Sequence, residues 1–215
     1  MTSRRERPAK PALTRDGIVR LAVGLMRTEG LARVTMRRLA TELDTGPASL
    51  YVYVRNTDDL HAAVLDEVLG ETDLSGGDGD WEDRLVAVLV SYTGVLFRHP
   101  ELARTALLTH PAGPHSMALV DRLLGLLAEG GLPLDRAAWL VDLLLQRGAA
   151  TAAEHGPPGD DQAMDPLRAS IAAAAPDRHP HLAKASKELL GGTGRERLDW
   201  GYRVLINGAI ATPRR

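Results

Sequence analysis

The stretch from Thr35 to Asn56 contains the residues whose types and spacing are most informative in this chain. Thr35 is a good N-cap for a short helix, because its hydroxyl can accept a backbone N–H. Asp44 tolerates the left-handed backbone of a tight turn, and Gly46 followed by Pro47 suits the start of a second helix. Two short helices joined by such a turn are typical of a helix-turn-helix, which places its second helix in the major groove of DNA.

Base reading in such a motif depends on the side chains that face outward. Between Pro47 and Tyr53 there is no Arg, Asn or Gln, so the usual bidentate base readers are absent. Arg37, in the preceding helix, is therefore the candidate for a guanine contact. Small side chains suit thymine methyls, and hydroxyls and Arg suit phosphates. The predicted DNA contacts are Thr35, Arg37, Pro47, Ala48, Ser49, Tyr51, Tyr53 and Arg55. The alternative is a helical hairpin buried in a core, and two aromatic residues predicted to face water argue against it.

Charge is distributed unevenly along the chain. The formal net charge is -2, but residues 1–57 hold eleven Lys and Arg against five Asp and Glu. A basic end on an acidic remainder is expected when only one end meets phosphate. The basic arm at residues 1–12 has too little apolar content to fold alone. Two interpretations of the arm remain open: it follows the DNA backbone or minor groove, or it is a solvated tail.

Residues 13–60 resemble the DNA-binding domain of the TetR family of bacterial transcriptional regulators. The residues that carry the resemblance are Gly30, Val34, Thr35, Arg37, Arg38, Leu39, Ala40, Leu43, Thr45, Gly46, Pro47, Ser49, Leu50, Tyr51, Tyr53, Val54, Asn56, Asp59 and Leu60. The chain departs from the family at Asp44, where Gly is usual. It departs again at Thr57, where the tetracycline repressor has a phosphate-contacting Lys. The resemblance therefore implies a weaker backbone contact at Thr57.

A looser resemblance covers the rest of the chain. Trp81, His99-Pro100, Asp199–Tyr202 and Leu205–Gly208 look like the C-terminal domain of the tetracycline-repressor subclass. That resemblance implies a homodimer whose body binds a small molecule and thereby shifts the distance between two DNA-binding heads. Positions matching the polar drug- and metal-binding residues of the tetracycline repressor are Asp73, Val88 and Ala106. Since two of these cannot chelate through a side chain, the expected effector is a more apolar or aromatic molecule than a magnesium–tetracycline chelate.

Composition favours an all-α protein. Apolar residues make up 44% of the chain but aromatic residues only 4%, so the core must be built from Leu, Ala and Val, which suits helices. No run approaches the ~18 apolar residues of a membrane span, and no secretory signal is evident. The absence of cysteine excludes disulfides and thiolate metal sites. We therefore expect a cytoplasmic protein that does not contact a membrane.

Helical periodicity and breaker residues divide the chain into four predicted parts. These are the basic arm at 1–12, a three-helix helix-turn-helix domain at 13–60, a connecting helix and linker at 61–80, and a larger helical effector-binding and dimerisation domain at 81–215. The fourth helix is expected at 57–69, and residues 74–80 are expected to form a flexible break. Further helices are expected at about 81–99, 101–109, 115–129, 135–155 and 196–211.

The helix at 81–99 suggests a small-molecule pocket in the body. It has apolar and polar side chains on or near one face, and residues from two other helices are expected to line the opposite side. The predicted ligand contacts are Val88, Tyr92, Leu96, His99, Met117, Trp139 and Gln146. The alternative is plain core packing, in which Tyr92 and His99 are satisfied by neighbouring groups.

The helix at 135–155 is apolar nearly all round, so it needs partners on two sides. We expect it to pair with the helix at 196–211 and with their symmetry mates in a four-helix bundle about a two-fold axis. The predicted dimer contacts are Leu145, Gly148, Ala149, Ala152, Trp200, Gly201, Leu205 and Gly208.

Catalytic and metal-binding motifs are missing from the sequence. There is no phosphate-cradling glycine loop and no activated nucleophile, so no enzyme activity and no cofactor are expected. His179 and His181 flank a proline, which favours a surface loop over a metal clamp. Two functions remain: a ligand-responsive repressor that binds operator DNA as a homodimer, or a DNA-binding regulator without a small-molecule effector, controlled by a protein partner or constitutive.

Overall fold

A computed structural model describes residues 12–109, 111–154 and 165–213. Within these ranges the chain forms eleven α-helices and one 3-10 helix, and no strand. The expected all-α fold class is therefore confirmed. The basic arm predicted at residues 1–12 lies, apart from its last residue, outside the described residues. None of the helices in the described ranges is long and apolar enough to cross a membrane.

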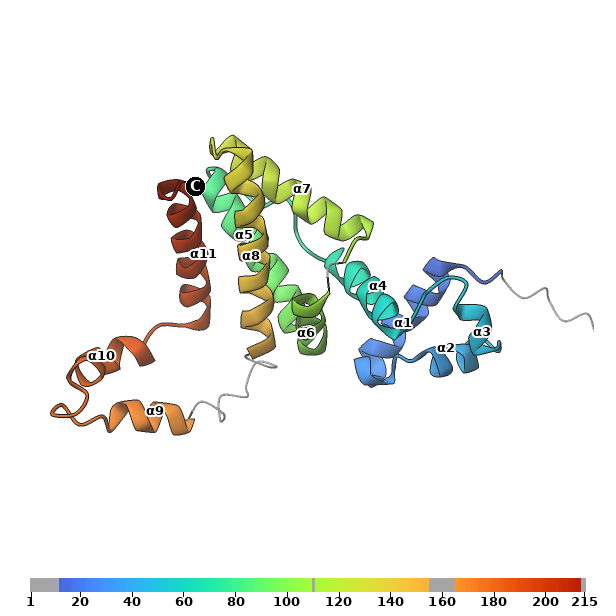
Figure 1. The fold of residues 1–215 in the computed structure, drawn as a ribbon, viewed down its shortest axis with the longest axis horizontal. Coiled ribbons are helices and arrows are strands. Elements are labelled where there is room, and N and C mark those ends of the chain that lie inside the picture. Colours follow the sequence, from blue (N-terminus) through green and yellow to red (C-terminus); the bar gives the residue numbers. More distant parts are fainter. Residues whose placement is uncertain (1–11, 110, 155–164, 214–215) are drawn as a thin grey trace, which may run out of the picture.

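The first helices form what we call the head, at one end of the molecule (Figure 1). They are α1 (Arg15–Glu29), the 3-10 helix η1 (Leu31–Arg33), α2 (Met36–Glu42) and α3 (Pro47–Leu50). α1 begins at Thr14, whose hydroxyl accepts the Gly17 N–H, and ends at Gly30, which adopts φ 87°. Ile18 and Leu50 are fully buried between the helices, so a small apolar core holds the head together.

α4 (Thr57–Leu69) connects the head to the rest of the chain, which we call the body (Figure 1). Asn56 caps the helix, because its side chain accepts the Asp59 N–H, and the helix covers the range 57–69 expected from the sequence. Asp66 is buried on α4, and its carboxylate accepts the backbone N–H of Ser116 at 2.8 Å and its hydroxyl at 2.5 Å. Because Ser116 lies in the first turn of α7 (Pro114–Glu129), Asp66 caps a body helix from the connecting helix.

Residues 74–80, predicted as a flexible break, have a defined set of contacts. The Arg122 guanidinium donates to the carbonyls of Leu74 at 2.8 Å and Ser75 at 3.0 Å. Gly76 adopts φ 74°, and a Cβ there would lie 2.7 Å from the Arg84 carbonyl oxygen. The turn therefore needs glycine both for its backbone conformation and for close packing.

The body is built around α5 (Trp81–Phe97), α6 (Pro100–Leu108), α7 and α8 (Leu134–Glu154). α8 packs against both α5 and α6, and α7 packs against α4, α5 and α8. Leu85, Leu89 and Leu96 of α5 are fully buried, which places α5 at the centre. These four helices lie close to the predicted ranges, and α6 and α7 begin with a proline while Asp80 caps α5.

Two helices were not predicted: α9 (Asp165–Ala172) and α10 (Pro180–Leu190). They contact each other and stand apart from the body, with no buried residue in either (Figure 1). His179 and His181 are exposed as expected, but the surface loop predicted around them is wrong, because Pro180 begins α10. Proline at a first helical position is a helix-start signal that the loop interpretation overlooked.

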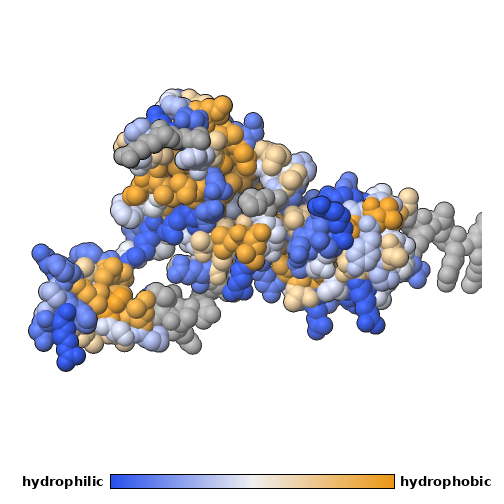
Figure 2. Space-filling model, viewed as in Figure 1, coloured by the Kyte–Doolittle hydropathy of each residue, from blue (hydrophilic) through white to orange (hydrophobic). Residues whose placement is uncertain are grey.

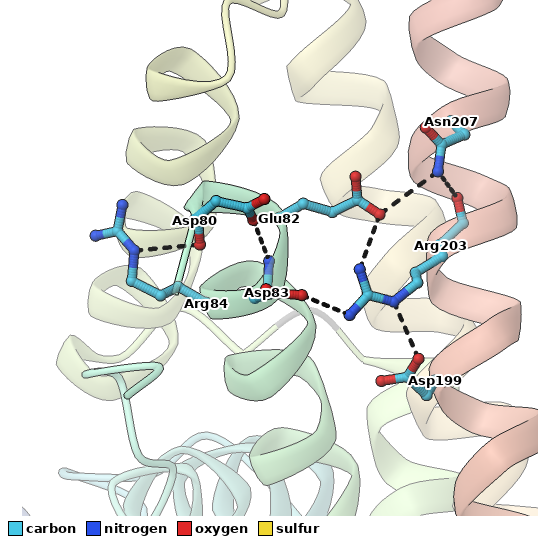
Figure 3. Close-up of polar contacts among 7 residues, drawn as sticks. All are labelled: Asp80, Glu82, Asp83, Arg84, Asp199, Arg203 and Asn207. Carbon is cyan, nitrogen blue, oxygen red and sulfur yellow. Dashed lines mark hydrogen bonds and ion pairs between the residues drawn. The ribbon is translucent and has the colours of Figure 1, made fainter. Parts of the chain in front are cut away.

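The last helix, α11 (Gly194–Ala211), begins at a capping box formed by Thr193 and Glu196. Its Arg203 side chain bonds Glu82 at 3.1 Å and Asp83 at 2.7 Å in the first turn of α5, and Asp199 at 3.0 Å one turn back (Figure 3). The hydrogen bond to Asp83 is the largest cause of a raised pKa at Arg203. These bonds fix α11 beside α5.

Candidate nucleic-acid interface

The predicted turn between α2 and α3 is present in the head. The Thr35 hydroxyl accepts the Arg38 N–H at 3.2 Å and so caps α2. Asp44 adopts φ 47°, the only positive φ outside glycine in the described residues. Gly46 is the N-cap of α3 and Pro47 its first residue, while Leu50 is fully buried. The sequence therefore predicted the local geometry of the helix-turn-helix correctly.

The outward face of α3 is accessible. Pro47, Ala48 and Ser49 are exposed, and 54% of Tyr51 is accessible to solvent. Tyr53, which was predicted to face outward, is instead half-buried and packs against the core. The reason is the turn after α3, in which the Tyr53 N–H donates to the Leu50 carbonyl and folds the chain back toward the buried Val54.

The two adjacent arginines of α2 have different environments. The Arg38 guanidinium lies 2.9 Å from the Glu29 carboxylate and 3.0 Å from that of Glu42. It therefore ties α2 to α1. Arg37 is exposed, and no hydrogen bond or ion pair of its guanidinium is seen among the described residues, so its role as a base reader stays a prediction.

The start of α4 supplies a third group of predicted contacts. Arg55 has 86% of its side chain exposed and lies 3.3 Å from the Asp59 carboxylate. The Arg55 backbone N–H also donates to Asp59, and this hydrogen bond is the main cause of a lowered pKa at Asp59. Thr57 is half-buried at the first position of α4. Backbone N–H groups at a helix start attract phosphate, and the contacts of Arg55 and Thr57 with a DNA backbone stay predictions.

The predicted ligand contacts separate into two groups. Val88, Tyr92 and Leu96 are buried on α5, and His99 is half-buried at its end. Burial lowers the pKa of His99. By contrast, Met117, Trp139 and Gln146 are exposed, with Trp139 59% accessible. The expectation that these last three line the opposite side of a pocket facing α5 is therefore wrong, because each lies on the outer side of its helix.

A buried hydroxyl cluster lies where α5, α8 and α11 meet. Thr93 Oγ1 lies 2.7 Å from the Tyr202 hydroxyl and donates to the Leu89 carbonyl at 2.8 Å. The Tyr92 hydroxyl donates to the Leu145 carbonyl at 3.3 Å. Burial raises the pKa of both tyrosines, that of Tyr202 to about 12. Both hydroxyls therefore stay protonated donors at neutral pH.

Some of the predicted dimer contacts are buried inside the protomer, and the others are half-buried or exposed. Gly148, Ala149 and Ala152 are buried within the protomer, so their assignment to a dimer interface is wrong. A Cβ on Gly148 would lie 2.6 Å from the Tyr202 hydroxyl, which shows that its small size serves packing inside one chain. Leu145, Gly201 and Leu205 are half-buried, and Trp200 and Gly208 are exposed.

An apolar surface runs along the outer sides of α8 and α11. We call it the α8–α11 face, and its exposed large residues are Trp139, Leu143, Trp200, Val204 and Ile210. It contains an open groove of about 400 Å³ between the two helices. In Figure 2, apolar side chains gather over the body and over α9 and α10. Apolar area of this kind is typical of a surface that another protein covers.

Two family models match this chain and together cover most of it. The profile for bacterial regulatory proteins of the tetR family matches residues 18–64, and that for the tetracyclin repressor-like C-terminal domain matches residues 75–211. This chain belongs to the TetR family. Members of the TetR family are transcriptional regulators and not enzymes.

Relatives and solved structures agree with the TetR assignment. The HTH-type transcriptional repressor DrrR1 of Streptomyces coeruleorubidus is 31% identical over 227 aligned residues, covering 95% of this chain and 83% of the relative. An HTH-type transcriptional regulator of Saccharopolyspora erythraea is 37% identical over 123 residues, 57% of this chain and about half (52%) of that relative. The crystal structure of SCO7704 from Streptomyces, described as a transcription regulator, has a TM-score of 0.83 at 53% identity and covers 96% of this chain and 98% of that one. The TetR-family protein ActR of Streptomyces coelicolor, in complex with actinorhodin, has a TM-score of 0.80 at 33% identity and covers 93% and 98%.

This TetR-family chain does not assemble a metal site from its described residues. No group of three or more His, Asp or Glu residues there is placed to hold a metal ion. Of the three positions matched to the tetracycline repressor, Val88 is fully buried and Ala106 half-buried. The Asp73 carboxylate is exposed and accepts the Ser75 N–H at 2.9 Å.

Proposed function

We propose that this TetR-family regulator is a homodimeric repressor that leaves its operator when a small aromatic molecule binds the body. The observation that carries the proposal is the accessible face of α3, with Tyr51 beside it and Arg37 exposed at the start of α2. A repressor that matches 95% of this chain supports the repressor role. The ActR–actinorhodin complex supports an aromatic effector. The cytoplasmic location expected from the sequence stays a prediction.

The first test concerns sequence-specific DNA binding. Sites are selected from random and genomic duplexes with the full-length chain, and the affinity for the selected operator is compared with that for an unrelated duplex. Arg37→Ala is expected to weaken operator binding by about 1–3 kcal/mol and to relax sequence preference. Arg33→Ala, an exposed arginine in η1, is the matched control. Equal losses on operator and unrelated DNA would show that Arg37 contacts phosphate and reads no base.

The α8–α11 face supports the homodimer. Its exposed tryptophans lie on two neighbouring helices, and Trp139 and Leu143 are one turn apart on α8. An isologous contact brings the same face of a second copy against it, and this buries the apolar area of both chains at once. Among the predicted contacts, Trp200, Leu205 and Gly208 fit this face.

Effector binding is tested with actinorhodin as the probe. A ligand that binds only the folded state stabilises it by about 2.7 kcal/mol at a hundred times its Kd, and so raises Tm. Release is measured as loss of operator binding at the same probe concentration. A screen of further polycyclic aromatic molecules follows if actinorhodin does not bind. A screen with no Tm increase favours the alternative, a DNA-binding regulator without a small-molecule effector.

We expect the effector to approach the body near Tyr92 and His99. Tyr92 is buried with its hydroxyl donating to the Leu145 carbonyl at 3.3 Å, and His99 is half-buried at the end of α5. An effector that contacts them must therefore open the packing between α5 and α8. A few polar groups in an apolar site are typical of small-molecule binding. Tyr92→Phe is expected to weaken probe binding while operator affinity stays unchanged.

A further inference from the structure

We propose that Glu101 of the body positions the helix-turn-helix for DNA by accepting the backbone N–H of Leu31 in the head. The inference rests on the proposed DNA-binding function and adds a means by which the body controls it. Glu101 Oε2 lies 2.7 Å from the Leu31 nitrogen, in a partly buried hydrogen bond that spans 70 positions of sequence.

Leu31 presents a backbone donor that its own helix cannot satisfy. α1 ends at Gly30, whose φ of 87° turns the chain, and Leu31 begins η1. The first N–H groups of any helix lack intrahelical acceptors. Leu31 itself is buried, so its N–H needs an acceptor from elsewhere in the protein. The Glu101 carboxylate supplies it, and hydrogen bonds to an ionised acceptor are stronger than neutral ones.

The position of Glu101 in the body is fixed by the packing of α6. It lies in the first turn of α6 directly after Pro100, where the helix dipole favours a carboxylate. Leu102 and Ala103, the next two residues, are fully buried. α6 packs against α4 and extensively against α8. A displacement of α6 by a change in the body is therefore transmitted to Leu31.

On the head side, η1 leads directly into the DNA-binding elements. Val34 ends η1 and Thr35 caps α2, so only three residues separate Leu31 from that cap. His61 Nε2 on α4 lies 3.0 Å from the Val34 carbonyl, which ties the same segment to the connecting helix. The position of Leu31 thus sets that of α2, and with it Arg37.

A second polar bridge joins the head and the body through Glu71. Glu71, just after α4, bonds Arg27 of α1 at 2.5 Å and Arg98 at the end of α5 at 2.7 Å. About half of each arginine side chain is exposed, and ion pairs in water contribute little. The Glu101 bond, by contrast, satisfies the backbone N–H of a buried residue, so Glu71→Gln is expected to have the smaller effect.

The first test measures operator affinity against half-site spacing. The selected operator is lengthened or shortened between its half-sites by one and two base pairs. Wild-type protein is expected to bind one spacing best, because its heads are fixed. Glu101→Ala is expected to lose about threefold to tenfold at that spacing and to tolerate the others better. Glu101→Gln keeps an oxygen acceptor and should resemble wild type, as should Asp177→Ala, an exposed carboxylate between α9 and α10.

The second test needs neither DNA nor effector. The chain has no cysteine, so Arg20→Cys on α1 and Asp121→Cys on α7 allow two spin labels, with labelled chains diluted in unlabelled ones. Glu101→Ala should broaden the head–body distance distribution, and Glu101→Asp, one methylene shorter, should broaden or shift it. Circular dichroism melts confirm folding, and Glu101→Asp replaces Glu101→Ala if the latter unfolds.

The outcomes separate the two proposals. Broadened distances in a chain that binds no operator support positioning by Glu101 and overturn the proposed function. Narrow, wild-type distances and an unchanged spacing profile in Glu101→Ala and Glu101→Asp overturn the positioning role and leave the proposed function intact.

Discussion

At the scale of single residues, Gly148 leaves no room for a side chain. An added Cβ would lie 2.6 Å from the Tyr202 hydroxyl, 2.7 Å from Thr93 Oγ1 and 2.8 Å from Tyr92 Cε1. Three buried neighbours cannot all move away, so Gly148→Ala is expected to destabilise the protein by about 1–3 kcal/mol. The measurement is the free energy of unfolding in urea. Gly125→Ala on α7, where a Cβ meets nothing within 4 Å, should be neutral or slightly stabilising.

The buried Tyr202 predicts a dependence of stability on alkaline pH. Burial raises its pKa to about 12, above the ordinary value of about 10 that it regains on unfolding. Because the folded state holds the proton more tightly, the contribution is fully present below about pH 10 and is lost as pH rises through 12. Tyr202→Phe should therefore show a flatter decline of unfolding free energy between pH 10 and 12 than wild type. Parallel declines would contradict this assignment.

At the scale of helices, the sequence predicts where a helix begins and ends better than it predicts which side of the helix is buried. Thr35 caps α2 as expected, and Thr14 and Asn56 cap α1 and α4 in the same way, because a cap is decided by a few neighbouring residues. The side of α8 that meets the body depends on where α5 and α11 lie, which periodicity cannot show when a helix is apolar all round. Gly148 was consequently assigned to the dimer and Trp139 to the ligand pocket.

The same limit applies to the candidate DNA site. Pro47, Ala48, Ser49 and Arg37 are exposed as the prediction of DNA contacts requires, because a short turn of known chemistry fixes this segment. Tyr53 was misplaced because one further turn folds it onto the core. Glu101 was missed entirely: its partner is 70 positions away and is a backbone N–H, which leaves no mark in sequence.

The α8–α11 face predicts how the chain associates. A charge at Leu143 or Trp200 would be buried without a partner in a dimer made through this face, and such a charge is strongly destabilising. Leu143→Glu and Trp200→Glu should therefore sediment as monomers at micromolar concentration, where wild type sediments as a dimer. Asp177→Lys, exposed away from this face, is the control. A wild-type monomer at that concentration would rule out the dimer itself.

At the scale of the whole molecule, charge and connectivity are arranged for a switch. Basic residues are concentrated in the first 57 positions, and the remainder is acidic, so only the head is attracted to DNA. α4 is attached at both ends: it belongs to the head at Asn56, and at Asp66 it caps α7 of the body. This chain of packed and hydrogen-bonded elements is the route by which the proposed effector would move the head.

Two heads read adjacent major-groove turns only when their recognition helices lie about 34–36 Å apart. An effector that changes this spacing must bind the DNA-competent form less well, and by linkage operator DNA must weaken effector binding by the same factor. For a coupling of about 1–3 kcal/mol that factor is roughly 5 to 150. The measurement is effector affinity by calorimetry with and without saturating operator, and an unrelated duplex is the control. Equal affinities with and without operator would mean that the effector site does not control DNA binding.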